Sequence, residues 1–108
     1  MAAAITATMV QKQQIPTSIV SGSAEKRLMK LFLEGPKAAQ NDWFLLSTYL
    51  TTAECANISN VLISIDGEAG SANVPVLETW SYTSADVKLI AAGAVTGVSR
   101  AEVTYWCE

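Results

Sequence analysis

Short runs in which apolar and polar residues alternate dominate this sequence and limit the folds open to it. The run at residues 98–107 alternates inward-facing Ala101, Val103, Tyr105 and Cys107 with outward-facing Arg100, Glu102 and Thr104. A period of two places neighbouring side chains on opposite faces of a strand, so this run predicts a half-buried β-strand. Such runs recur at about ten-residue spacing with turn residues between them, which is typical of an antiparallel all-β domain.

About seven strands are expected along the chain. Their ranges are 4–12, 24–34, the front half of 41–52, 60–67, 74–83, 87–91 and 98–107. In the clearest of them, Val61, Ile63 and Ile65 face one way. Because 108 residues make about one small domain, we expect a single antiparallel β-sandwich over residues 1–108, with an open β-barrel as the alternative.

The segment SAEKRLMKLFLEGP, residues 23–36, fits two structures. As a helix it has Ser23 as N-cap and Gly35–Pro36 as a stop. As a strand it sends Met29, Leu31 and Leu33 to the core and Lys26, Leu28, Lys30 and Phe32 to the other face. Because the other elements alternate with period two, we predict the strand. A sandwich with one helix at residues 24–34 is the alternative.

Composition favours a folded chain that does not bind nucleic acid. Half of the residues are apolar and 16% are charged, unlike a disordered segment. The net charge is −3, with five basic and four acidic residues in 1–54 and two basic and six acidic in 55–108, too few basic groups for many phosphate contacts. The opening residues lack the basic start of a secretory signal, and uncharged runs fall short of the ~20 residues of a membrane helix, so we expect neither.

The absence of histidine removes the commonest catalytic and metal-binding side chain. Two cysteines are too few for an all-cysteine zinc site, and we expect Cys55 and Cys107 as separate thiols rather than a disulfide. Five acidic residues could contribute to a catalytic pair of carboxylates, but their spacing indicates no particular pair. They are Asp42, Asp66, Glu68, Glu78 and Asp86. We therefore expect no enzyme activity, no cofactor and no metal, and residues 66–68 as a hairpin turn rather than a calcium loop.

The three tryptophans suggest a second kind of function. Trp43 lies in an apolar run and is expected in the core, whereas Trp106 is expected on the face opposite Val103 and exposed. An exposed tryptophan suits a protein interface or a sugar-stacking site. A carbohydrate-binding or adhesion module is therefore the alternative function, in which glycan binding is lost on Trp80→Ala or Trp106→Ala.

Four of the seven basic residues cluster between positions 26 and 37. A solvated polar face is the ordinary explanation of such a cluster. On a strand, however, the basic residues alternate with Leu28 and Phe32, which indicates a docking surface for an acidic protein partner. The candidate partner interface consists of Lys26, Arg27, Leu28, Lys30, Phe32 and Trp106.

Five features follow one another along the chain. They are a threonine-rich first strand, a basic-then-apolar second strand ending in glycine, the block DWFLLSTYLTT, the strand ISNVLISIDG and the closing VKLIAAGAVTGVSRAEVTYW. Their order resembles that of small all-β virion proteins, which tailed phages and related viruses encode near their capsid genes. The resemblance covers most of the chain and lies in pattern and order rather than in an invariant motif.

This resemblance implies a structural role, in which the protein decorates or cements the outer face of an icosahedral head. Its partners would be the major capsid protein and copies of itself, often as trimers or clusters, in a virion assembled in the host cytoplasm. No catalytic residues are implied. Residues 1–10 would serve as an extended arm that adds a strand to a neighbouring subunit, or as the first strand of their own domain.

Overall fold

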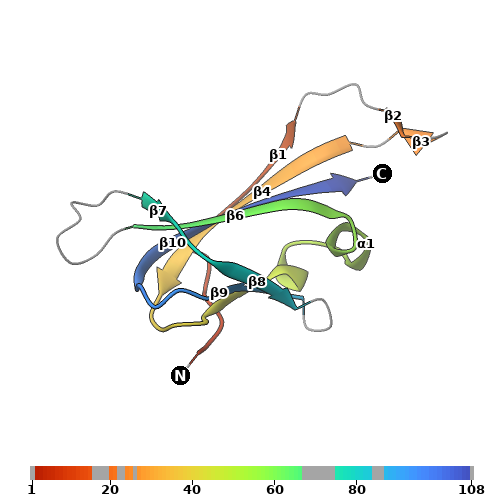
Figure 1. Cartoon of the computed structure of the whole chain (residues 1–108). Helices are drawn as coiled ribbons and strands as arrows, with labels where there is room; N and C mark the ends of the chain where they lie inside the picture. The colour runs from red at the N-terminus through yellow and green to blue at the C-terminus, as the bar shows by residue number, and fades with distance from the viewer. Residues whose placement is uncertain are drawn as a thin grey trace.

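A computed structural model describes residues 2–15, 20–21, 24–25, 27–66, 75–83 and 87–107. The chain forms two antiparallel β-sheets that pack face to face, so the predicted all-β sandwich is confirmed (Figure 1). A further two-stranded ribbon joins β2 (Val20–Ser21) to β3 (Ala24–Glu25). The sandwich is the expected result for strands that each present one apolar face, because the two faces bury each other.

The larger sheet has the strand order β1-β4-β10-β6-β7. Its strands are β1 (Met9–Ile15), β4 (Arg27–Lys37), β10 (Gly97–Cys107), β6 (Ile58–Asp66) and β7 (Pro75–Leu77). The central pair, β4 and β10, is antiparallel over its full length, from Gly97↔Lys37 to Cys107↔Arg27. These two strands, of 11 residues each, lie inside the sheet, and β6, the clearest strand in the sequence, pairs with β10 on its other side.

The smaller sheet has the order β5-β9-β8, with β5 (Trp43–Leu45), β9 (Lys88–Ala91) and β8 (Trp80–Thr83). A 3₁₀ turn, η1 (Leu46–Thr48), and a short helix, α1 (Thr52–Cys55), connect β5 to β6. The helix begins with a capping box, in which the Thr51 hydroxyl accepts from Glu54 N at 3.2 Å and Glu54 Oε1 accepts from Thr51 N at 2.8 Å.

Strand β4 decides between the two structures proposed for residues 24–34. Residues 27–34 are extended, so a helix there is wrong. Leu31 and Leu33 are buried and Met29 packs against the core, as the strand predicts. The strand also continues through Gly35 and Pro36 instead of stopping. Beyond Glu34 no β1 residue pairs with β4, so on that side Pro36 removes no ladder hydrogen bond.

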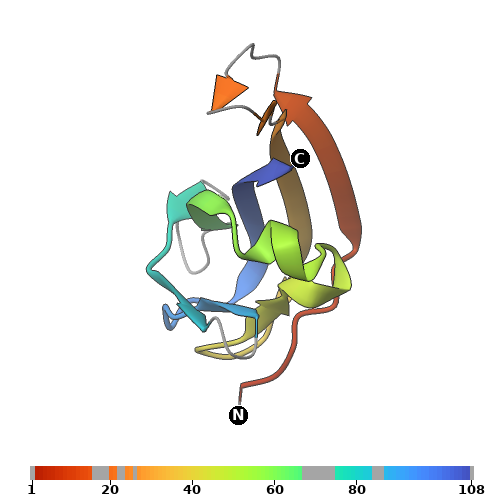
Figure 2. The ribbon, with the colours of Figure 1, turned by 90° about the vertical axis from the view of Figure 1, so that its right-hand side faces the viewer.

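Two other predicted strands have different boundaries, because the chain changes sheets within them. The first begins at Met9 rather than Ala4, since Ala4 instead forms a parallel bridge to Trp43 of the smaller sheet. The range 74–83 divides into β7 in the larger sheet and β8 in the smaller. Both changes join the two sheets at their sides (Figure 2). Alternation of side chains does not reveal such a change, since each half keeps its period.

The core fills the space between the sheets. Val61, Ile63 and Ile65 are buried on one side of β6, as predicted. Strand β9 begins at Lys88 rather than at residue 87, because Val87 has a positive φ of 55°. The buried apolar residues that form one cluster are Ile5, Leu31, Leu33, Phe44, Leu46, Leu50, Val61, Ile63, Leu89, Ala91, Ala101, Val103 and Tyr105.

Candidate functional site

The larger sheet turns one face toward the core and the other away from it. We call the second the outer face. By register, its residues on β1, β4, β10, β6 and β7 are Met9, Gln11, Gln13, Ile15, Leu28, Lys30, Phe32, Glu34, Val98, Arg100, Glu102, Thr104, Trp106, Asn60, Leu62, Ser64, Asp66 and Leu77.

Four of the six predicted interface residues lie together on this outer face. Leu28 is directly opposite Trp106, and the neighbouring pairs carry Lys30 and Phe32. Arg27 lies on the other face, with its Nη2 donating to Cys107 Sγ at 3.6 Å. Lys26 lies outside the described residues. Lys37, which the sequence groups with the basic cluster, is instead buried in the interior.

The charges of the outer face pair with one another. Lys30 Nζ is 3.9 Å from Glu102 Oε1 and 5.8 Å from the centre of the Phe32 ring. Arg100 donates to Asp66 Oδ1 at 2.5 Å and to Glu34 Oε1 at 2.7 Å, and these bonds raise the arginine pKa further. Two cations thus meet three carboxylates, so the described residues of this face carry no excess of positive charge.

The outer face also exposes several apolar side chains. Met9, Leu62 and Leu77 are 43%, 42% and 72% exposed, and Val98 is also exposed. Phe32 and Leu62 flank Glu102 across three adjacent strands. Exposed apolar residues that share one sheet face mark an interaction surface more strongly than scattered ones. The β4 part of this surface can be predicted from the sequence, whereas Leu62 and Leu77 join it only through strand pairing.

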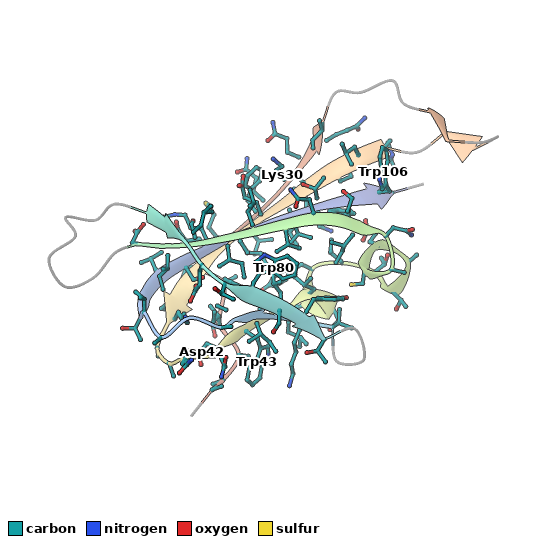
Figure 3. The ribbon with its side chains drawn as sticks, in the orientation of Figure 1. Lys30, Asp42, Trp43, Trp80 and Trp106 are labelled. Carbon is teal, nitrogen blue, oxygen red and sulfur yellow. The ribbon has the colours of Figure 1, made fainter. Side chains whose placement is uncertain are left out.

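The three tryptophans lie in different parts of the molecule (Figure 3). The prediction that Trp43 belongs to the core is wrong, because Phe44 takes the inward position and Trp43 is half-buried beneath Lys88, whose Nζ is 4.2 Å from the ring centre. Trp80 is exposed on β8. Trp106 lies on the face opposite Val103 as predicted, but it is half-buried rather than exposed. These three rings do not share one platform.

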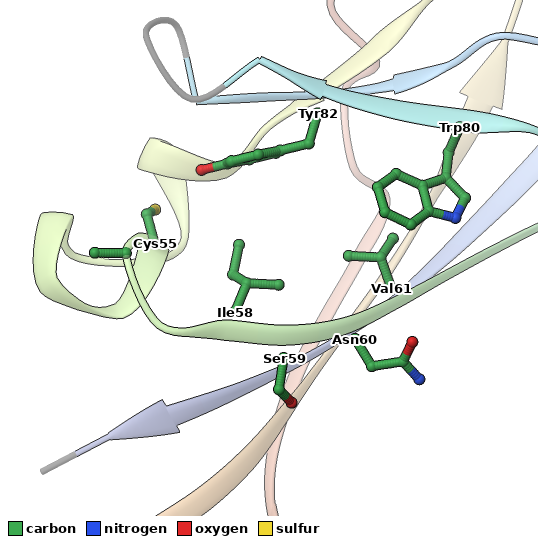
Figure 4. A pocket seen from close by; sticks show the side chains of 8 residues that line it. Cys55, Ile58, Ser59, Asn60, Val61, Trp80 and Tyr82 are labelled. Carbon is green, nitrogen blue, oxygen red and sulfur yellow. The ribbon is translucent and has the colours of Figure 1, made fainter.

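A groove of about 440 Å³ opens between β6 and β8. Figure 4 shows Trp80 and Tyr82 of β8 facing Ile58 and Val61 of β6, with Cys55 of α1 at one end. The side chains of β8 alternate, so the sequence WSYT places both rings on one face. The spacing of the two rings therefore indicates one wall of the groove in the sequence. The opposing wall comes from β6, about twenty residues earlier in the chain.

Cys55 and Cys107 are separate thiols rather than a disulfide, as expected. Cys55 is half-buried at the end of the groove, and desolvation, followed by the charge of Glu54, raises the pKa of its thiol. A thiol with a raised pKa is a poor nucleophile at neutral pH, because the thiolate is the reactive form. Cys55 therefore contributes apolar surface to the groove rather than covalent chemistry.

Asp42, one of the acidic residues considered for catalysis, has a structural role. Its carboxylate accepts hydrogen bonds from the backbone N–H groups of Ala3, Ala38 and Ala39 at 2.8, 2.9 and 3.0 Å. Desolvation raises the pKa of Asp42, but these three bonds and the charge of Lys37 outweigh it, so the pKa is lowered overall. The ionised carboxylate ties the N-terminal arm to the loop before β5.

Two of the remaining acidic candidates are also held in ion pairs. Asp66 binds Arg100, and Glu78 binds Lys37 in the interior. Glu68 and Asp86 lie outside the described residues, as does most of the predicted 66–68 turn. Within the described ranges, no three His, Cys, Asp or Glu side chains gather as they would around a metal ion.

The fold places the chain among all-β sandwich proteins. Comparison with protein-family models, with curated proteins and with solved structures found no match. In the part of the chain that the structure describes, no helix has the length and apolar character needed to cross a membrane.

Proposed function

We propose that this chain is a structural protein of a virus particle, without enzymatic activity, and that it decorates or cements the outer surface of the capsid. The observation that carries the proposal is the outer face of the larger sheet, where exposed Leu62 and Met9 lie among ion pairs that neutralise one another. The order of sequence features, which resembles that of small virion proteins, supplies the setting. Its partners are the major capsid protein and copies of the chain, with a trimer as one arrangement.

The chemistry of the outer face fits a protein partner. Phe32 and Leu62 provide apolar surface on either side of Glu102, and the neighbouring charged groups are already paired within the sheet. A partner that covers these side chains gains apolar burial without removing water from unpaired charges, which is the costly part of burying polar groups. A rigid sheet also loses little conformational entropy on binding.

Leu62→Arg is expected to weaken binding to capsids by about 2 kcal/mol or more, roughly thirtyfold in Kd, because it replaces exposed apolar surface of the contact with a charge. The measurement is sedimentation of the purified chain with particles that lack it. Val95→Arg is the matched control, since Val95 is 41% exposed, nearly the same as Leu62, but lies in the loop before β10. Equal binding of the two variants would contradict docking through the outer face.

Mass spectrometry of purified virus particles tests the setting itself. The chain should be present in a fixed ratio to the major capsid protein and should be accessible to protease on intact particles. Its absence from particles made by the virus that encodes it would remove the virion proposal, while leaving the outer face as a candidate surface for another partner.

The groove supports a carbohydrate-binding module as a second candidate function, because Trp80 and Tyr82 present two rings on one wall. In this case Trp80→Ala abolishes binding on a glycan array, since stacking on the indole supplies most of the contact. Trp43→Ala removes a tryptophan outside the groove and should leave binding intact. An array without any bound glycan for the unmodified chain excludes this function for the sugars displayed.

A further inference from the structure

Strand β1 forms one margin of the larger sheet. It pairs with β4 in an unbroken register from Met9↔Glu34 to Ile15↔Leu28, and its other edge pairs with no described strand. Six of its seven residues are exposed. Figure 2 shows β1 at the side of the sheet that is far from β7. Backbone N–H and C=O groups along this edge are therefore available to a further strand.

Proteins usually protect such an edge with proline, a bulge, a short strand or several charges. Strand β1 has none of the first three, and Lys12 is its one charged residue. The opposite margin of the same sheet differs, because β7 is three residues long and begins at Pro75. The contrast between the two margins indicates that β1 has a partner in the assembled protein.

The sequence of β1, MVQKQQI, indicates which partner. Read in either direction it has an apolar residue at each end, Met9 or Ile15, and a glutamine on each side of Lys12. An antiparallel pair of two such strands centred on Lys12 sets Met9 opposite Ile15 of the second copy and Gln11 opposite Gln13 of the second copy. Apolar residues then meet apolar residues, and amides meet amides, on the outer face.

We propose that β1 pairs antiparallel with β1 of a second copy and joins the two larger sheets across a two-fold axis. This inference deepens the proposed function, and rests on it only in taking self-association as part of the chain's role. A two-fold contact of this kind is isologous, so one edge provides both halves of the interface. The outer faces of both copies continue into one surface and remain free for a capsid.

Lys12 is the unfavourable element of this pairing, because it lies opposite Lys12 of the second copy. Both lysines are on the side of the sheet away from the outer face. Glu54 of α1 lies near it: the pKa of Glu54 is lowered first by its hydrogen bond with Thr51 N and also by the charge of Lys12. Each lysine therefore has a carboxylate of its own chain nearby, which limits the repulsion between copies. Removing the charge should strengthen the pair.

Analytical ultracentrifugation of the full chain over a range of concentrations tests the proposal. The unmodified chain should form dimers, and Gln11→Lys with Gln13→Lys should weaken them at least about tenfold, because like charges then face each other twice. Thr79→Lys with Ser81→Lys adds the same charge at two exposed positions in and beside β8 and should leave the dimer intact. Hydrogen exchange at residues 9–15 should slow as concentration rises.

A chain that stays monomeric up to about 1 mM overturns the inference, as does a dimer that both double variants weaken equally. Lys12→Thr offers a second test that needs no added charge: it should tighten the dimer severalfold, and a weaker dimer contradicts the register centred on Lys12. Leu62→Arg should dimerise like the unmodified chain. Loss of capsid binding and loss of dimerisation are therefore separate results.

Discussion

Lys37→Met is expected to lower the free energy of unfolding by about 3–5 kcal/mol. Lys37 and Glu78 form an ion pair in the interior, where their side chains are 0% and 3% exposed, and Lys37 Nζ also donates to Gly93 O at 2.5 Å. Removing the lysine leaves a buried carboxylate without its cation, and Glu78 Oε2 already lacks a hydrogen-bond partner. A domain of this size has only about 5–15 kcal/mol of stability, so the loss is a large part of the total.

Urea unfolding measures this effect as a shift of the midpoint at constant m-value. The double variant Lys37→Met with Glu78→Leu should recover most of the loss, because two apolar side chains replace the pair without an uncompensated charge. Lys30→Met is the matched control, since Lys30 also lies near a carboxylate but its side chain is 32% exposed, and its loss should cost less than about 1 kcal/mol. Equal costs at Lys30 and Lys37 would contradict the role of burial.

Gly35→Ala is expected to destabilise the protein by about 1–3 kcal/mol and to loosen the N-terminal arm. A Cβ at position 35 would lie 2.7 Å from both Ile5 Cγ2 and Thr6 O. Ile5 can shift its side chain, but Thr6 O belongs to the backbone, so the arm itself must move. Ile5 is buried in the core and its N–H donates to Trp43 O at 2.7 Å, and both contacts weaken when the arm moves away from β4.

Limited proteolysis tests this prediction together with thermal unfolding. Cleavage within residues 2–8 should be faster in Gly35→Ala than in the unmodified chain. Ser64→Thr is the control, because it adds one methyl group to the same sheet on the outer face, away from the arm. An arm that stays equally resistant to protease in Gly35→Ala would contradict the close packing of Gly35 against Ile5 and Thr6.

The side-chain pattern of the larger sheet could be predicted from the sequence. Leu31 and Leu33 are buried, Lys30 and Phe32 face outward, and Ala101, Val103 and Tyr105 fill the core. These assignments succeed because the period of a strand is a local property: once a run is extended, its alternate residues face opposite sides. The prediction of a strand rather than a helix at residues 24–34 rests on the same argument.

The groove and the composition of the outer face could not be predicted in this way. Leu62 and Phe32 lie on either side of Glu102 only because β10 sits between β4 and β6. Trp80 and Val61 line one groove only because the chain changes sheets after Leu77. The ion pairs of the outer face could not be predicted either, since the carboxylates that bind Lys30 and Arg100 come from other strands.

The sequence by itself determined that this chain is built of strands and which side of each central strand is apolar. The tertiary structure alone decided what those sides meet. Lys37 is buried because Glu78, 41 residues away, crosses between the sheets beside it, and Trp43 faces outward because Phe44 occupies the core. The physical reason is one of range: alternation depends on neighbouring residues, whereas strand order and burial depend on contacts between distant parts of the chain.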